Sequence, residues 1–463
     1  MSTTSQLTQD ILAGVPEGQR VQYVRNWLKD FDKEVSAKRE MIAQFRQWLE
    51  QLSDESITRS YQQHYNPIYL NLASVFGEEL PFEKIQSLTI DCIKTKLWDE
   101  CEYYFHLSEL LDSVKSVRNE KEFAADESLL RLKGWDTGLI RSLLSRGRGL
   151  IICSFRLGAI RYVPIEFALL GFPIVQVVNT PAFEAVQAAF ASLGNDGDEK
   201  ISSHTEGPNL RLLKTVDAED ALCTVELVNA LKRNEIIGMC IEGNTGSDGP
   251  WGDTSKCRIN FLGHTLLAKN GAARLAAALR TPILPLIALK HGDTSGELFF
   301  SEPIIPPAGL KRSEVEEFVK TSMQSLYALF ESYVRLHPQQ WEGWSALHRW
   351  RECDDVAAND RASGNVDPKE ISQLLGDARR FRINPRRVAQ LPTKDGVMWV
   401  DLRTLKGFQN PKWAEPENLL AILSKPEGLD LTWIDNTSRD PEWKEKICGL
   451  LAYLRQSDLV STC

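Results

Sequence analysis

The residues most able to do chemistry lie at the ends of two short apolar runs. Cys153 and Ser154 end the run GLIICS, and Glu242 follows the run IIGMCI at 236–241. A thiol or hydroxyl can act as a nucleophile and a carboxylate as a base, so the three predict a catalytic site. A cysteine at a strand end near a helix N-terminus can also have a lowered pKa. The alternatives are a small buried cysteine and a serine that caps a helix.

A second group of residues could bind a polar or anionic ligand near these three. Glycines let the backbone approach a ligand closely, small hydroxyls donate hydrogen bonds, and arginines supply positive charge for a phosphate or carboxylate. The candidates are Arg156, Gly243, Thr245, Ser247, Arg258 and His264. His264 is also a candidate base. The alternatives are an ordinary turn, solvated arginines and a structural histidine.

Hydrophobic periodicity predicts the elements that position these groups. From 147 to about 295 short apolar runs alternate with helical patterns, which predicts an α/β layer with a largely parallel sheet. The expected strands are 149–153, 173–178, 236–241 and 282–289, and the expected helices end at Gly171 or cover 266–279 and 313–337. Residues 1 to about 145 place large apolar residues at three-to-four-residue spacing, which predicts packed amphipathic helices.

The chain divides into four parts by composition. These are a helical region 1–136, the α/β core 137–351, a polar linker 352–376, and a small α+β domain 377–463. In the last part, Asp395-Gly396 predicts a hairpin between the runs RRVAQLP and GVMWVDLRT. Two amphipathic stretches, PENLLAIL and EWKEKICGLLAYLRQS, predict the helices that follow.

Charge and composition favour some classes of protein over others. Lys plus Arg number 54 and Asp plus Glu 63, and the resulting charge of −9 argues against nucleic acid or anionic membrane as the main partner. We find no apolar run of about 18 residues and no secretion signal, so we expect a cytoplasmic protein without a transmembrane segment. The nine scattered cysteines lack Cys-x-x-Cys spacing, which favours reduced thiols over disulfides or a metal site. The oligomeric state stays open.

Four stretches of the core resemble the lysophospholipid acyltransferase superfamily, and most closely the late lipid A acyltransferases of bacteria. They are SLLSRGRGLIICSFRLGAIRYVPIEFALLGFPIVQVV, ALKRNEIIGMCIEGNTGS, INFLGHTLLAKNGAARLAAALRTPILPL and HPQQWEGWSALHRWR. The family's first motif is His-x4-Asp/Glu, in which the imidazole takes a proton from the acceptor hydroxyl and the carboxylate orients the ring. Ser154 stands at the histidine position and Ala159 at the carboxylate position, so the pair is absent. Loss of a positioned base costs about 10²–10⁴ in rate.

Three hypotheses for the core follow from this resemblance. In the first, Cys153 or Ser154 is the nucleophile, and Glu242 or His264 is the base. In the second, the site positions an amine acceptor against an activated thioester, since orientation alone is worth roughly 7–11 kcal/mol. In the third, the fold has lost catalysis and only binds. The resemblance implies a coenzyme A or acyl carrier protein thioester as co-substrate and no bound cofactor or metal. In the relatives, a Glu-Gly-Thr-Arg-Ser loop binds the acceptor; here its arginine is missing.

Residues from about 380 to 462 resemble the RiPP recognition element, the small winged-helix domain of the pyrroloquinoline-quinone peptide chaperone kind (RiPPs are ribosomally made, post-translationally modified peptides). The stretches FRINPRRVAQL, GVMWVDLRTLKGFQ, NLLAIL and LAYLRQSDLV carry the resemblance. It implies that a leader peptide adds as a strand to the third strand, from 405 to 409, and lies against the last helix. The expected contacts are Leu405, Lys406, Phe408, Leu450 and Tyr453. A packing or dimerisation domain is the alternative, and the acidic chain argues against nucleic acid binding.

Together the two resemblances predict a divergent acyltransferase-like tailoring protein of peptide natural product biosynthesis. Such a protein binds a precursor peptide and transfers an acyl group from a coenzyme A or carrier-protein thioester. One alternative is a non-catalytic protein that recruits peptide or carrier protein for another enzyme. Another is an acyltransferase that acts on a small-molecule or lipid acceptor.

Overall fold

The computed structural model describes most of the chain in two compact units. The described residues are 12, 14–31, 33–116, 131–194, 212–242, 256–292, 295–351, 380–384, 387–393, 396–401, 407–408, 419–423, 425, 427–437, 440–456 and 459–462. The first unit comprises Met1–Tyr65 and Ile90–Gly343, and the second comprises Asn66–Thr89 and Trp344–Cys463. The helical region expected at the N-terminus therefore shares a unit with the α/β core over most of its length. The expected linker 352–376 lies outside the described residues.

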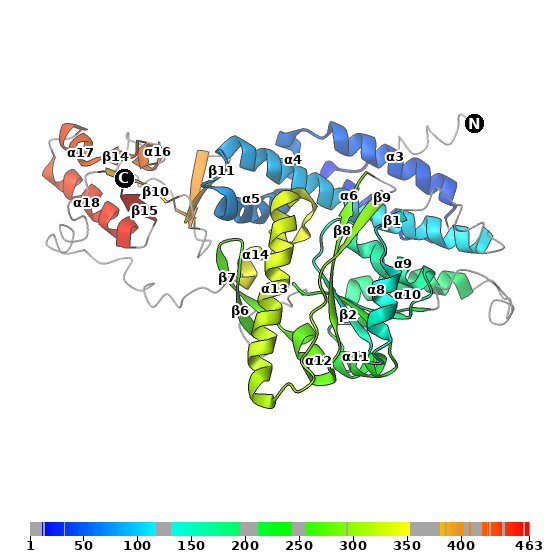
Figure 1. Ribbon diagram of the computed structural model, residues 1–463. Helices are drawn as coiled ribbons and strands as arrows, with labels where there is room; N and C mark the ends of the chain where they lie inside the picture. The colour runs from blue at the N-terminus through cyan, green and yellow to red at the C-terminus, as the bar shows by residue number, and fades with distance from the viewer. Residues whose placement is uncertain are drawn as a thin grey trace. The chain divides into compact units, whose positions relative to one another are not determined.

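A mixed sheet of seven described strands forms the centre of the first unit (Figure 1). Its strand order is β1-β9-β8-β2-β5-β3-β4. The strands are β1 Arg131–Lys133, β2 Leu150–Ser154, β3 Ile174–Val178, β4 Leu213–Asp217, β5 Ile236–Cys240, β8 Ile283–Lys290 and β9 Ser295–Phe300. Every pairing is parallel except that between β8 and β9. The predicted α/β layer with a largely parallel sheet is confirmed.

Helices connect these strands, and the strand β2 lies in the middle of the sheet. The helices are α8 Thr137–Leu144, α9 Val163–Leu169, α10 Thr180–Gly194, α11 Cys223–Lys232, α12 Gly271–Leu279 and α13 Val315–Leu336. All five residues of β2 are buried. A parallel strand covered on both faces has this continuous apolar sequence because neither face meets water. On one face Leu150 and Ile152 pack in a cluster with Phe167 and Leu284.

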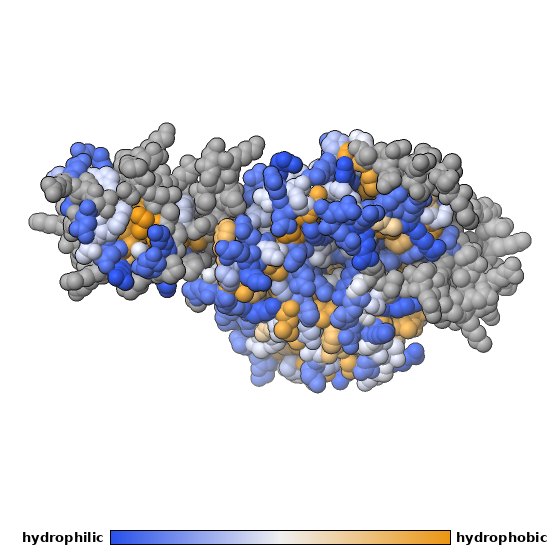
Figure 2. Space-filling view, turned by 90° about the horizontal axis from the view of Figure 1, so that it is seen from above, coloured by the Kyte–Doolittle hydropathy of each residue, from blue (hydrophilic) through white to orange (hydrophobic). Residues whose placement is uncertain are grey.

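The N-terminal residues are mainly helical, as the spacing of apolar residues predicts. The helices are α2 Arg20–Leu28, α3 Val35–Gln51, α4 Asp54–Ser60, α5 Gln62–Phe76 and α6 Phe82–Ser116. Their buried positions are mostly apolar and recur at helical spacing, as in Met41, Phe45 and Leu49 of α3. The face of the molecule seen in Figure 2 is mainly hydrophilic, with hydrophobic residues scattered in small groups. The strand β1 interrupts the predicted helical region because its backbone pairs with β9.

The helix predicted over 266–279 is partly wrong. Residues 264–269 form the strand β7 (His264–Lys269), which pairs with β6 (Lys256–Phe261), and the helix α12 begins only at Gly271. Leu262 and Gly263 connect the two strands, and both have positive φ (52° and 77°). Two central residues with positive φ are typical of a tight hairpin turn. The sequence does not indicate this turn because leucine rarely adopts a positive φ.

The second unit contains two small described sheets and several helices. The strands β11 Val388–Thr393, β12 Gly396–Asp401 and β13 Gly407–Phe408 form an antiparallel sheet in that order, which confirms the predicted pairing of the first two. The strands β10 Arg380–Ile383, β14 Leu429–Asp430 and β15 Val460–Thr462 form the other. The helices α16 Leu419–Leu423, α17 Leu431–Thr437 and α18 Pro441–Gln456 contribute to a common apolar core.

A glycine after β2 allows a close approach that other residues would prevent. Gly158 has φ +57°, and a Cβ there would lie 2.5 Å from the carbonyl oxygen of Ala288 and 2.5 Å from the side-chain oxygen of Gln340. We expect Gly158→Ala to lower the free energy of unfolding by about 2–4 kcal/mol, because it adds a steric clash to backbone strain. Urea unfolding followed by circular dichroism measures the change. Gly171→Ala is the control, since Gly171 has φ +83° and open space; an equal loss in both variants would contradict the close-approach argument.

Candidate functional site

Two neighbouring strands bring several of the predicted site residues to one edge of the sheet. Ser154 at the end of β2 pairs in register with Cys240 at the end of β5. Arg156 lies two residues after Ser154, and Glu242 lies two residues after Cys240. Arg156 and Glu242 are in direct contact. The carboxyl ends of parallel strands are the usual place for ligand sites in α/β sheets. The structure therefore places Ser154, Arg156 and Glu242 at one candidate site.

Glu242 is a buried carboxylate with well-defined hydrogen-bond donors. Its side chain is only 3% exposed. The backbone N–H of Arg156 lies 3.1 Å and 3.0 Å from its two oxygens, and the indole N–H of Trp341 donates to Oε1 at 2.7 Å. Burial raises the pKa of Glu242, while the charge of Arg156 and the bond from Trp341 oppose that rise. The Glu242 carboxylate thus connects the turn after β2 with Trp341.

The segment 338–342 pairs with the turn that follows β2. The N–H of Gly158 donates to the carbonyl oxygen of Gln340 (3.0 Å), and the N–H of Glu342 donates to the carbonyl oxygen of Arg156 (3.0 Å). Between them Leu157 and Trp341 form an antiparallel bridge. The segment 338–342 therefore lies against the turn after β2 as a short added strand.

Side chains of the same segment reach further along the sheet edge. The Gln340 amide accepts from the N–H of Lys290 (3.0 Å) and donates to its carbonyl oxygen (3.2 Å), at the end of β8. The Trp341 ring packs against Phe155 and Phe261, at centroid separations of 5.9 Å and 5.6 Å. These contacts hold the indole in the orientation that reaches Glu242. One short segment thus connects the ends of β2, β5 and β8.

Buried ion pairs surround this arrangement. Arg161 donates to Glu342 from Nε (3.1 Å) and Nη2 (2.6 Å). The Lys290 ammonium lies 3.1 Å from Asp99 and also contacts Glu102, both on α6. Burial raises the pKa of Asp99 to about 6, although the charge of Lys290 opposes the rise. The helix α6 is therefore bound to the sheet edge by charge as well as by apolar packing.

The charged stripe on α6 continues for another turn. His106 Nδ1 lies 3.2 Å from Glu109, and Nε2 lies 3.6 Å from Glu102. Burial alone lowers the pKa of His106, but hydrogen bonds to Glu102 and Glu109 raise it overall. Arg39 of α3 completes the stripe with a bond to Glu109 of 2.9 Å. The buried charges of α6 thus have charged partners, of which Arg39 is itself largely exposed.

Cys153 and Ser154 are not placed as exposed nucleophiles. Cys153 is fully buried, and burial raises the pKa of its thiol, which fits the alternative of a small buried cysteine and not that of a thiol with a lowered pKa. The end of β2 lies inside the sheet, where desolvation disfavours a thiolate. Ser154 is 1% exposed, and its hydroxyl donates to the carbonyl oxygen of Phe155 (3.2 Å). The next helical turn, Ile160–Tyr162, is preceded by Ala159, so Ser154 does not cap it.

The remaining candidate residues lie on other elements. Arg258 is on β6, and His264 is the half-buried first residue of β7, next to Phe261 in the register. Phe408 lies in β13, and Leu450 and Tyr453 lie on α18, with Tyr453 40% exposed. The candidates outside the described residues are Gly243, Thr245, Ser247, Leu405 and Lys406.

The sequence analysis missed three residues of the site. The sequence indicated Gln340 and Trp341 only as part of a family-like signature, and it did not predict that Trp341 contacts Glu242. Cys240 pairs in register with Ser154 at the end of β5 and lies two residues before Glu242. It is partly exposed, and burial raises its thiol pKa. Strand alternation from Glu242 back to Cys240 is the signal that could have identified it.

Removal of one donor should show how much the Glu242 contact contributes. We expect Trp341→Phe to lower the free energy of unfolding by about 1–3 kcal/mol, because it leaves a buried carboxylate with one donor fewer. The donor stabilises the ionised carboxylate, so the loss should be larger at pH 8 than at pH 5. Chemical denaturation followed by circular dichroism at both pH values measures this. Trp98→Phe is the matched control; a pH-independent loss, or one no larger than the control's, would contradict the argument.

The ion pairs of Lys290 give a second pH-dependent prediction. We expect Lys290→Met to destabilise the protein by about 3–5 kcal/mol at pH 8, because it leaves Asp99 and Glu102 without their cation. The loss should shrink towards pH 5, where Asp99, with its pKa near 6, is largely protonated. Thermal unfolding across this range is the measurement. Lys33→Met removes a more exposed pair with Asp30 and should cost under about 1 kcal/mol. A loss that grows on acidification would refute the assignment.

Within the ranges that the structure describes, no three His, Cys, Asp or Glu side chains are grouped as a metal site. Likewise, none of the described helices combines the length and the apolar sequence needed to cross a membrane. A scan against family models and a search of curated proteins found no match to this chain.

Proposed function

We propose that this protein takes part in the maturation of ribosomally made peptides, binding a precursor peptide and presenting it for acyl transfer. The observation that carries the proposal is the position of β13 in the second unit. It is the last described strand of the antiparallel sheet β11-β12-β13, and the described helices α16, α17 and α18 follow it in sequence. A terminal strand has main-chain groups on its outer side that a peptide can pair with.

Side chains of α18 support the same interpretation. Tyr453 is 40% exposed, and Leu450 lies one turn before it, half-buried. Residues three apart share one face of a helix. Exposed tyrosines are frequent anchors of protein interfaces because they bury a large area at low entropic cost. We therefore infer that these two residues contact the bound leader peptide.

The α/β layer is proposed to transfer an acyl group by positioning its substrates. An amine attacks the thioester carbonyl; the C–N bond forms, the C–S bond breaks, and the proton lost by the amine ends on the departing thiol. Because the thioester is activated, orientation can supply much of the rate without a strong base. The burial of Cys153 and Ser154 favours this scheme over covalent catalysis. In it, Arg156 and Glu242 shape the site, and Glu242 acts as a positioning residue.

A second candidate function is recruitment without catalysis. The exposed fractions are 0% for Cys153, 1% for Ser154 and 3% for Glu242. A substrate therefore cannot reach these three side chains in this structure. Their hydrogen bonds are made within the fold. A protein that binds peptide and carrier protein for another enzyme needs the surfaces and not this site. An acyltransferase for a small-molecule or lipid acceptor remains a third proposal from the family resemblance.

The test combines binding with a search for transferred mass. Short peptides encoded beside this chain's gene are mixed with the full-length protein and with acyl-coenzyme A or acyl carrier protein. We expect one peptide to bind and to gain the mass of an acyl group, as measured by mass spectrometry. Tyr453→Asp should weaken its binding about tenfold, because it puts a charge in the contact. Leu336→Asp changes a residue that is 72% exposed on α13 and should have no effect.

The outcomes separate the candidates. Tight binding without a mass gain from any donor would favour recruitment. Turnover of a small-molecule acceptor without peptide would favour the third proposal. Absence of binding by every such peptide, or equal binding by both variants, would contradict the peptide-binding proposal itself.

A further inference from the structure

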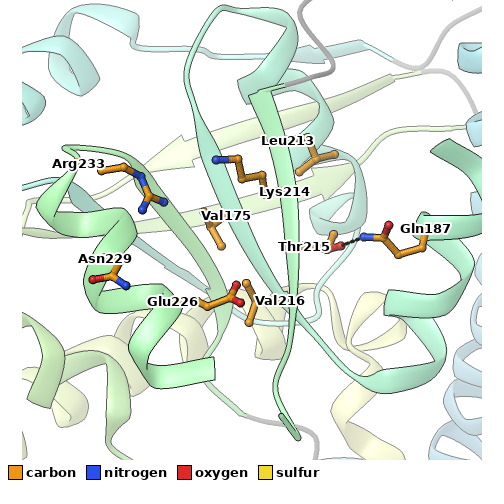
Figure 3. A pocket seen from close by; sticks show the side chains of 9 residues that line it. All are labelled: Val175, Gln187, Leu213, Lys214, Thr215, Val216, Glu226, Asn229 and Arg233. Carbon is orange, nitrogen blue, oxygen red and sulfur yellow. Dashed lines mark hydrogen bonds between the residues drawn. The ribbon is translucent and has the colours of Figure 1, made fainter. Parts of the chain in front are cut away.

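A polar groove runs along β4, the last strand at one end of the described sheet. Its cavity has a volume of about 450 Å³. The lining residues are Val175, Gln187, Leu213, Lys214, Thr215, Val216, Glu226, Asn229 and Arg233 (Figure 3). Four of them are consecutive residues of β4, so the groove follows the strand and is open to both of its faces. Nothing in the proposed site at β2 and β5 uses this groove.

Two helices form the walls of the groove, and β4 forms its floor. The helix α10 leads from β3 out to β4, and α11 leads from β4 back to β5. Since such crossovers are right-handed, opposite directions place the two helices on opposite faces of the sheet. In Figure 3, Gln187 of α10 reaches the Thr215 hydroxyl from one side (3.3 Å), and Glu226 and Asn229 of α11 lie on the other. The edge of the sheet is therefore recessed between two helices.

The outer side of β4 carries main-chain groups available for pairing. The N–H of Ala218 donates to the carbonyl oxygen of Val178 (2.8 Å), so residue 218 faces β3. Main-chain groups alternate in direction along a strand, and those of Leu213, Thr215 and Asp217 therefore face outward. In the described part of the sheet no strand pairs with this side of β4. The groove floor thus has the donors and acceptors that strand addition requires.

The charges of the groove favour an occupant with a basic group. Glu235 holds Arg233 through two bonds (2.8 Å and 2.9 Å) and lies 3.9 Å from Lys214, so both cations have a partner. The Glu226 carboxylate makes no hydrogen bond or ion pair within 4 Å among the described residues, although its charge also acts on Arg233 of the same lining. Outside the groove lining, Leu222 at the N-cap of α11 and Val225 within α11 are 61% and 54% exposed. Large apolar side chains exposed together often mark an interaction site.

We propose that the groove between α10 and α11 binds an extended peptide segment as an added strand on β4, with a basic side chain at Glu226. Building on the proposed function, the segment is the part of the precursor peptide that receives the acyl group. The strand order β5-β3-β4 separates β4 from β5 by two strand spacings, about 10 Å. All three strands are parallel, so their carboxyl ends lie at the same edge as Glu242. One end of a peptide along β4 therefore lies at the same edge of the sheet as the candidate site, three strand spacings from β5.

The recess argues against a second copy of this chain as the occupant. Edge-to-edge pairing of two sheets requires both edges to protrude, or at least to be flat. Here each β4 lies between its own α10 and α11, and these helices would meet before the strands could pair. A single extended peptide has no such flanking elements.

Binding of short fluorescent probes to the full-length protein tests the proposal. One probe is a peptide of alternating valine and threonine with a single lysine; its twin has glutamate instead. We expect Glu226→Lys to weaken binding of the lysine probe about threefold to fivefold and to strengthen binding of the glutamate probe. We expect Thr215→Pro to weaken both about fivefold, because it removes one outward N–H. Fluorescence anisotropy measures the affinities.

Thr215→Val is the matched control for the backbone variant, since it keeps the N–H and removes only the hydroxyl. Proline is tolerated on the outer side of an edge strand, and circular dichroism checks that the fold is kept. Equal binding by the proline and valine variants would overturn the proposal. So would a dimer that Thr215→Pro converts to monomer, because a second copy would then be the occupant.

The two proposals can fail separately. If no probe binds while the precursor peptide still binds in a Tyr453-dependent way, the groove proposal is wrong and the proposed function stands. If the probes bind as expected while no precursor peptide requires Tyr453, the groove is confirmed as a peptide site and the leader-binding proposal is wrong.

Discussion

The arrangement of the sheet edge depends on the hydrogen bonds that the Glu242 carboxylate accepts. A buried charge is tolerated only when donors replace the water it has lost. Here one donor is the backbone of the turn after β2, and the other is an indole that lies 99 residues away in sequence. The carboxylate therefore fixes the turn and the segment 338–342 together. Gln340, which bonds both main-chain groups of Lys290, extends the same constraint to β8.

This constraint explains why the turn after β2 has the sequence pattern of a catalytic turn but contains no base. The family-like pattern lacks the imidazole and its carboxylate partner, and the described structure uses the remaining polar groups to hold the fold. Ser154 donates to a neighbouring carbonyl, and Cys153 is a buried thiol whose pKa is raised. Positioning of activated substrates, or binding alone, fits such a site better than nucleophilic attack. Charged pairs on α6 then add rigidity behind it, because each buried charge has a partner.

The peptide-binding proposals for the two units share one physical basis. In each, a short strand ends a described sheet, and main-chain groups on its outer side can pair with an extended chain. They differ in what surrounds the strand. Beside β4, two helices and the charge of Glu226 restrict the occupant, whereas the second unit offers the exposed aromatic face of Tyr453. A precursor peptide with a recognition part and a reacting part would need two such surfaces of different selectivity.

The local elements and the class of fold could be read from the amino-acid sequence. Continuous apolar runs such as 150–154 and 236–240 specify buried parallel strands, because hydrophobic periodicity is a local property. It failed at 264–269, where LLAK fits a helix as well as a strand and a leucine with positive φ conceals the hairpin turn. The pairing of Glu242 with Trp341, the raised pKa of Cys153 and the recessed edge of β4 could not be predicted in this way. Each of these depends on which distant segments exclude water from a group, and that is a property of packing that no local pattern contains.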